Sequence, residues 1–163
     1  MNLKDMKNTK LKFIRLIISL LTVVIVSALL ISCKSEFKKL PENKTDKSKI
    51  EFAMNIATSY FTALKNGNSY DFENNAITDF TEKMTPNFQK QTYDQIKKTF
   101  GNFESLKYSG TWVEKENNDF QIIRLKGNFG QQKTPLEIRV IVTNSNKIAG
   151  LWVKPWKDNL NNY

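Results

Sequence analysis

The sequence predicts an α+β domain, in which helices pack on one face of an antiparallel sheet, behind an N-terminal membrane-targeting segment. Between residues 50 and 100, apolar residues recur at spacings of three and four, which is the period of an α-helix. After Gly101 the period changes to two, and short runs of Asn, Asp and Ser separate the segments, as between consecutive strands. Helices that precede strands favour this class over a parallel α/β fold.

The first helix is predicted to begin near Ser48 and to end before Gly67. Ser48 and Glu51 have the spacing of a capping box, in which each side chain accepts a hydrogen bond from a backbone N–H at the helix start. Glycine favours a helix end because it readily adopts the left-handed backbone conformation. One face of this helix carries the residues that we expect in the core: Ala53, Ile56, Ala57, Tyr60, Phe61 and Leu64.

Two more helices are predicted before the sheet. One covers about residues 69–83, and its expected inward side chains are Phe72, Ala76, Ile77 and Phe80. The other covers about residues 86–99, because Thr85 and Pro86 are typical of a helix cap and a first helical residue. Its inward face is expected to carry Phe88, Thr92, Ile96 and Phe100.

The sheet is predicted to have four strands joined by short turns. Alternating apolar residues mark Leu106, Tyr108 and Trp112 in the first strand and Leu136, Ile138, Val140 and Val142 in the third. The second is "FQIIRLKGNF" and the fourth lies in "KIAGLWVKPW", with turns at "NND" and "NSN". The expected result is an antiparallel meander, so that the domain covers residues 50–156 and a polar tail covers 157–163.

A positively charged start and an apolar run precede this domain. Residues 1–32 contain five Lys and Arg and one Asp, a net charge of +4, and residues 16–31 carry no charge at all. This is the layout of a secretory signal, whose basic end stays in the cytoplasm. We therefore expect residues 1–32 to be a signal peptide that directs the rest of the chain out of the cytoplasm.

The end of the apolar run carries a second pattern, Leu30-Ile31-Ser32-Cys33. It resembles the lipobox of bacterial lipoproteins, with leucine three positions before the cysteine and a small residue directly before it. The resemblance implies that the Cys33 thiol receives a diacylglyceryl group, that the chain is cut before Cys33, and that acyl chains such as palmitate hold it in the cell envelope. The alternative is an uncleaved anchor, although the uncharged run spans only about 24 Å at about 1.5 Å per residue, against a hydrocarbon core of about 30 Å.

Residues 33–49 are predicted to form a flexible tether. They contain six Lys and three acids, together with Pro, Asn and Ser and few apolar residues, which is typical of disorder. Two alternatives remain for these lysines: they attract anionic headgroups beside the anchor, by up to about 1 kcal/mol each, or they only keep the tether soluble. Lys34 rather than Asp follows Cys33, so the lipoprotein resemblance favours the outer membrane in a cell with two membranes and the cell membrane otherwise.

A second resemblance concerns the domain itself. Three helices followed by a four-stranded antiparallel sheet resemble the cystatin-like α+β cone of the nuclear transport factor 2-like superfamily, and within it a bacterial family of unknown function. The stretches that carry the likeness are "YFTALKNGNSYDF", "MTPNF", "QIKKTFGNFESLKYSG" and "KIAGLWVKP". The likeness covers roughly residues 50–156 and implies an open-ended cone, but it brings no catalytic residues to carry over.

The amino-acid composition and the absence of known motifs argue against several kinds of catalytic and metal site. There is no histidine, which is the commonest general base and metal ligand, and the single cysteine excludes an intrachain disulfide. No nucleophile elbow or phosphate-binding loop is present, so we expect no cofactor, no metal and no catalytic site. The pairs Asp71/Glu73 and Asp79/Glu82 are interpreted as exposed helix-end and surface acids rather than as metal ligands.

Four residues are candidates for lining a pocket: Tyr60, Tyr108, Trp112 and Arg124. Tyr108 and Trp112 share one face of a regular strand, and Arg124 has the register of Phe120 and Ile122. Two alternatives remain for Arg124: it binds an anion inside an apolar pocket, or it lies on the outer sheet face or pairs with an acid. No acid is expected to face the core, because Glu137 lies opposite Leu136, Ile138 and Val140 in register.

These observations predict a lipid-anchored binding or interaction module outside the cytoplasm. Its partners would be the membrane, through Cys33, and a small apolar ligand or a protein. Residues 50–163 contain 14 Lys and Arg and 12 Asp and Glu, a net charge of +2, so we expect no nucleic-acid binding. The alternatives are a cone-fold enzyme acting on a small hydrophobic substrate, which would need an acid or tyrosine in the cone, and a structural or dimerising domain with a filled cone. The sequence leaves the oligomeric state open.

Overall fold

The computed structural model describes residues 37–114, 119–130, 135–158 and 160. Five strands form one sheet: β1 (Phe37–Lys39), β2 (Phe103–Glu114), β3 (Phe120–Phe129), β4 (Leu136–Thr143) and β5 (Ile148–Pro155). The helices are α2 (Lys47–Lys65), α3 (Thr78–Lys83) and α4 (Pro86–Phe100), with a short 3-10 turn, η1 (Glu42–Lys44). The predicted signal peptide and Cys33 lie outside the described residues. No helix in the described part of the chain is long and apolar enough to cross a membrane.

The α+β class is confirmed, with one sheet in the order β1-β2-β3-β4-β5 and every neighbouring pair antiparallel. The expected count of four strands is one too low, because β1 comes from the predicted tether. Phe37 and Lys39 pair with Glu114 and Trp112 at the end of β2. Backbone pairing along a long neighbouring strand orders this segment despite its polar composition.

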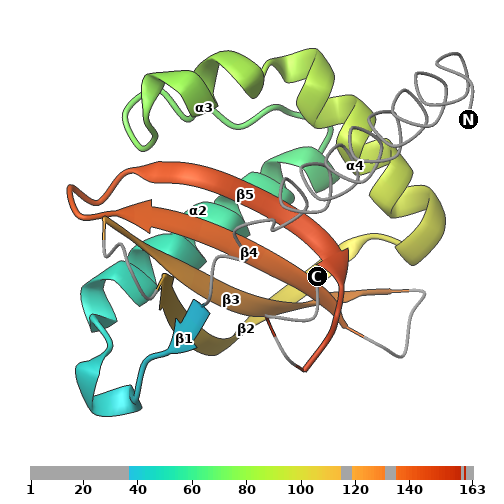
Figure 1. The fold of residues 1–163 in the computed structure, drawn as a ribbon. Helices are drawn as coiled ribbons and strands as arrows, with labels where there is room; N and C mark the ends of the chain where they lie inside the picture. Colours follow the sequence, from blue (N-terminus) through green and yellow to red (C-terminus); the bar gives the residue numbers. More distant parts are fainter. Residues whose placement is uncertain (1–36, 115–118, 131–134, 159, 161–163) are drawn as a thin grey trace, which may run out of the picture. The chain divides into compact units, whose positions relative to one another are not determined.

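Helix α2 lies behind the sheet in Figure 1, and α3 and α4 lie beyond β5. The predicted inward face of α2 is confirmed, since all six of its listed residues are buried. Its predicted cap is wrong: Asp46, not Ser48, caps the helix, and its carboxylate accepts hydrogen bonds from the backbone N–H groups of Ser48 and Lys49. The helix therefore begins at Lys47.

The second predicted helix is much shorter than expected. Only residues 78–83 are helical, because residues 75–77 pair with the start of β5 instead. The Ile148 N–H donates to the Asn75 carbonyl at 2.8 Å, and the Ile77 N–H donates to the Ile148 carbonyl at 3.0 Å. These long-range bonds give the backbone partners that a helix would otherwise have provided.

Helix α4 begins as predicted, with Thr85 as cap and Pro86 in the first turn. Its predicted inward face is partly wrong, because Phe88 is 49% exposed while Gln89 and Tyr93 are buried with Ile96. The inward face is rotated by about one residue, since the loop at Tyr70 packs against Gln89. Gly101 ends the helix at φ 89°, a conformation that favours glycine.

The sheet separates two apolar clusters. The larger lies between the helices and the sheet, with Phe61, Ile123, Leu125, Ile138 and Val140 fully buried. The smaller lies on the opposite face of the sheet, which we call the outer face, around Trp112, Ile122 and Leu160. Both faces of the sheet are thus partly covered, the outer one by residues that follow β5.

Candidate functional site

A groove lies between α4 and β5, which is an edge strand of the sheet in the described part of the chain. Its volume is about 570 Å³, within the range of about 300–1,000 Å³ typical of ligand sites. Most of its lining is apolar. The apolar residues are Met84, Phe88, Ile96 and Phe100 on the helical side and Leu136, Leu151, Trp152, Val153 and Pro155 on the sheet side. The groove therefore offers an elongated apolar surface to a ligand.

The groove continues along α3. A second hollow of about 410 Å³ shares Met84, Phe88, Leu151 and Trp152 with the groove and adds Ile77 and Phe80. At the far end of the second hollow, residues 75–77 pair with Ile148 and cover the start of β5. Beyond Ile148 the edge of β5 borders the two hollows, so the groove follows the strand.

Polar groups line one stretch of the groove. Thr92, Gln95 and Thr99 project from α4, and Lys154 lies on β5. Tyr60, 2% exposed, reaches the groove from α2, and burial raises the pKa of its phenol well above its ordinary value of 10.0. Tyr60 therefore stays a neutral phenol well above neutral pH.

The mouth of the groove carries two exposed aromatic side chains, Phe88 at 49% and Trp152 at 47%. Trp152 lies on the outer face, and a Cβ added at Gly150 would be 2.1 Å from its indole ring. The ring therefore lies directly over Gly150, which has no side chain to hold it away. The same Gly-x-Trp arrangement recurs in β2, where a Cβ at Gly110 would be 2.6 Å from the Trp112 ring.

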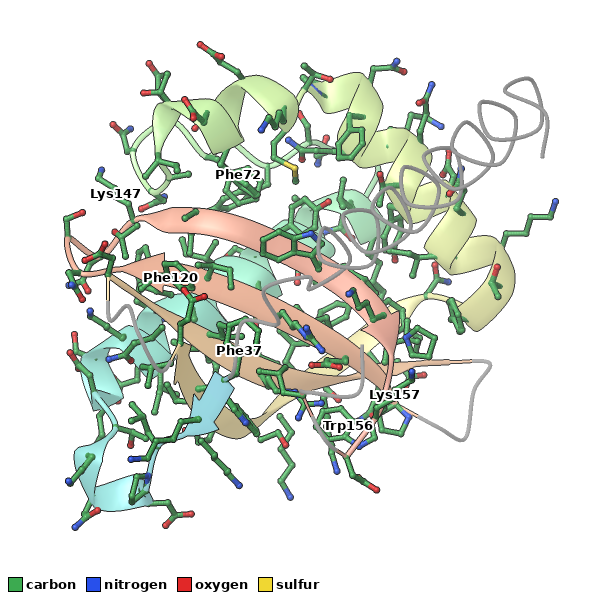
Figure 2. The ribbon with its side chains drawn as sticks, in the orientation of Figure 1. Phe37, Phe72, Phe120, Lys147, Trp156 and Lys157 are labelled. Atoms are coloured by element: carbon green, nitrogen blue, oxygen red, sulfur yellow. The ribbon has the colours of Figure 1, made fainter. Side chains whose placement is uncertain are left out.

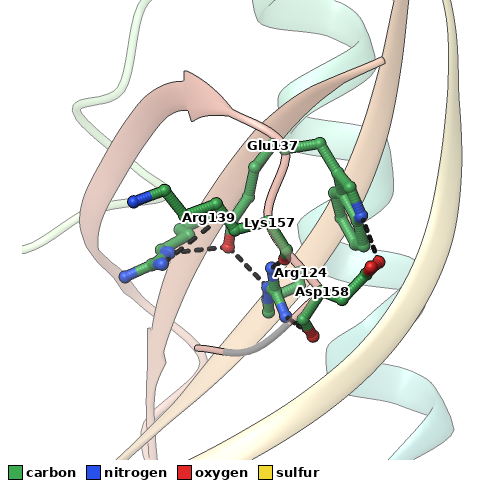
Figure 3. Close-up of polar contacts among 6 residues, drawn as sticks. Arg124, Glu137, Arg139, Lys157 and Asp158 are labelled. Atoms are coloured by element: carbon green, nitrogen blue, oxygen red, sulfur yellow. Dashed lines mark hydrogen bonds and ion pairs between the residues drawn. The ribbon is translucent and has the colours of Figure 1, made fainter. Parts of the chain in front are cut away.

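The outer face holds a buried charged network around Glu137 (Figure 3). Glu137 accepts hydrogen bonds from the Nε atoms of Arg124 and Arg139, at 2.5 and 2.7 Å. Arg124 also donates to the backbone carbonyls of Lys157 and Asp158. Arg124 and Glu137 are fully buried, so each charge depends on these partners.

Two tryptophans enclose the Arg124 guanidinium. Its Cζ is 4.8 Å from the centre of the Trp112 ring and 4.5 Å from that of Trp156. Leu160 packs on Trp112 and Ile122 in the same cluster. Residues 156–158 and 160 therefore form a strap over this half of the outer face, which we call the outer strap.

The four predicted pocket residues do not line one pocket. Tyr60 lies at the groove, whereas Tyr108 packs on the main core and its hydroxyl lies 2.9 Å from the Thr111 hydroxyl. Trp112 belongs to the outer face, because an irregularity in register between Tyr108 and Gly110 shifts the alternation of β2. The expectation that Tyr108 and Trp112 share a face is therefore wrong.

Arg124 follows the second of its two alternatives: it lies on the outer face and pairs with Glu137. Glu137 lies opposite Leu136 and Ile138, as its register predicted, yet it is fully buried there. Among the described residues, no group of three or more Cys, Asp or Glu is placed to hold a metal ion.

Sequence reasoning missed the groove residues on β5 and the buried Gln89. The Gln89 amide donates to the carbonyls of Tyr70 and Met84 and accepts from the Tyr70 N–H. The available signal was the helical position of Gln89, four residues before Tyr93. For Trp152, the signal was its place two residues after a glycine, as for Trp112.

Comparisons with protein-family models, with curated proteins and with solved structures give no match.

Proposed function

We propose that this protein is a lipid-anchored binding module that holds a small apolar or amphipathic ligand in the groove between α4 and β5. The observation that carries this proposal is the groove itself, about 570 Å³ in volume and lined mainly by aliphatic and aromatic side chains. An acyl chain fits such a lining, while Thr92, Gln95 and Lys154 offer partners to a polar end. The lipobox at Cys33 supports a location at the outside of the cell membrane or at the outer membrane.

The proposal extends to the fold. The order of three helices and an antiparallel meander supports the nuclear transport factor 2-like cone, with the groove as its opening. The enzyme alternative is less well supported, because the groove of about 570 Å³ has no carboxylate in its lining among the described residues. Asp79, which lines the second hollow along α3, is exposed to solvent rather than held in an apolar pocket. A dimerising domain with a filled cone is also less well supported, because the groove is open and bordered by exposed Phe88 and Trp152.

The test is a titration with a fluorescent fatty acid, for example a dansylated undecanoic acid. The chain from residue 36 onward contains both apolar clusters and forms one compact unit. We expect it to bind the probe and to enhance its emission. Native mass spectrometry with a mixture of fatty acids then gives the preferred chain length.

Two neighbouring positions on α4 provide a matched pair of variants. Thr92 lines the groove and Gln91 is exposed outside it, so Thr92→Trp fills the groove and Gln91→Trp does not. We expect Thr92→Trp to weaken probe binding by at least about tenfold, or about 1.4 kcal/mol, and Gln91→Trp to leave it unchanged. Absence of binding to the unmodified chain, or equal binding by both variants, would contradict the proposal.

A further inference from the structure

The outer face has a second half next to the outer strap, where the described residues leave a hollow. A hollow of about 390 Å³ there is lined by Phe37, Phe120, Ile122, Ile141, Ala149 and Trp152, with Arg139 and Lys154 beside them. We call it the outer hollow. Phe37 and Phe120 lie on the face of the sheet turned away from α2 (Figure 2). The outer hollow therefore combines partly exposed apolar side chains with two cations.

Basic residues dominate this face of the sheet. The strand register puts Lys39, Lys107, Arg124, Lys126, Arg139 and Lys154 on it, against Glu114 and Glu137. Within residues 50–163, five of these cations and both acids give a net charge of +3, whereas the whole of that range carries only +2. The positive charge of the domain is thus concentrated on the outer face, where it complements an anionic surface.

The chain also leads from this face toward Cys33. Phe37 lines the outer hollow, and only four peptide steps separate it from Cys33. Four residues span at most about 14 Å when fully extended. If Cys33 is lipidated, the membrane surface lies within about that distance of Phe37, at the β1 end of the outer hollow, and Trp152 and Lys154 of β5 form the other end of the hollow.

We propose that the outer face, around Trp152 and the outer hollow, docks on an anionic lipid surface. Tryptophan favours the interface between headgroups and acyl chains, because its ring is apolar with one polar N–H. Lysine and arginine side chains lay their apolar stems on such a surface and reach headgroup phosphates with their charged ends. This inference depends on the proposed anchor at Cys33 but not on the ligand of the groove. Docking would orient the domain and fix the direction from which the groove is reached.

The test uses the full mature chain, purified from bacterial membranes and reconstituted in vesicles of phosphatidylcholine and phosphatidylglycerol. Brominated acyl chains quench tryptophan emission only on contact. We expect strong quenching in the mixed vesicles and weaker quenching in vesicles of phosphatidylcholine alone. Trp152→Phe should remove most of the quenching. In a control, Trp152→Phe is combined with Thr62→Trp, which moves the reporter to the exposed side of α2. This chain should be quenched no more than Trp152→Phe alone.

A charge-reversal pair provides an independent readout that does not touch Trp152. Lys39→Glu with Lys107→Glu changes the outer face, and Lys65→Glu with Lys97→Glu makes the same change in charge on α2 and α4. We expect the first pair to reduce quenching by at least about half, because each reversal replaces an attraction to anionic headgroups with a repulsion. The second pair should leave quenching unchanged.

The outcomes separate the two proposals. If the chain sediments with vesicles while Trp152 stays unquenched, the anchor proposal stands and the docking proposal is wrong. In that case, a dimeric mass would show that a second copy of the chain covers the outer hollow. Protection of the hollow in a monomer would show that another segment of the same chain covers it. If the chain does not sediment with vesicles, both the anchor proposal and the docking proposal are wrong.

Discussion

Single residues on the outer face show where sequence reasoning succeeds and where it stops. Arg124 was a candidate because its register placed it among apolar residues, and pairing with an acid was one of two predicted alternatives. The partner was harder to identify, because Glu137 reads as an ordinary outward-facing acid in an alternating strand. Its burial depends on two arginines and on the outer strap, whose carbonyls bind Arg124 more than 30 positions along the chain.

Glu137→Gln tests this network. The variant keeps the shape of the side chain but leaves the buried Arg124 guanidinium and its neighbour Arg139 without a counter-charge. We expect a loss of about 3–5 kcal/mol in the free energy of unfolding, as for other broken buried ion pairs. Urea denaturation followed by tryptophan emission measures it. Glu82→Gln, at an exposed position of α3, is the control, and an equal effect of both changes would show that the network is not stabilising.

Elements were predicted more reliably than their orientation. The boundaries of α4 follow from Thr85, Pro86 and Gly101, which act locally, and the sequence predicted them correctly. The face that α4 turns inward depends on the loop at Tyr70, which packs on it from outside the helix. The Gln89 amide serves that loop as a backbone would, donating to and accepting from Tyr70 at 2.9 Å in both directions. Hydrophobic periodicity contains no signal for such a contact.

Gln89→Met measures what this contact contributes. Methionine has a similar volume but leaves the Tyr70 backbone groups and the Met84 carbonyl without their partner. We expect the free energy of unfolding to fall by about 2–3 kcal/mol, since each buried polar group left unsatisfied costs about 1–3 kcal/mol. Gln91→Met, exposed on the same helix, should change it by less than about 0.5 kcal/mol. Equal stability of the two variants would contradict this role of Gln89.

For the molecule as a whole, the sequence predicted the α+β class and the order of its elements but not the groove. Period and turn residues are local signals, and they determine which elements form. The groove arises where α4 approaches β5, about 50 residues later in the chain, and no local pattern specifies that approach. For the same reason the extra strand β1 was missed, because its pairing partner is the end of β2.

The predicted anchor is also a property of the whole molecule, and Cys33→Ser tests it. In a bacterial host supplied with labelled palmitate, we expect the unmodified chain to take up label and to lose residues 1–32. Cys33→Ser should take up none and keep the full mass. Ser32→Ala keeps a small residue before the cysteine and should be processed normally. If the unmodified chain keeps its full mass and takes up no label, the lipoprotein prediction is wrong.

The outer strap leaves the ribosome after all five strands, since its residues follow Pro155. Until it arrives, the Arg124 guanidinium lacks two carbonyl acceptors and one of its two aromatic walls. A chain that crosses a membrane channel from its N-terminal side would therefore complete the outer side of its sheet only when these last residues emerge. A fusion partner joined directly after Pro155 would omit them. A tag joined after residue 160 leaves the strap intact.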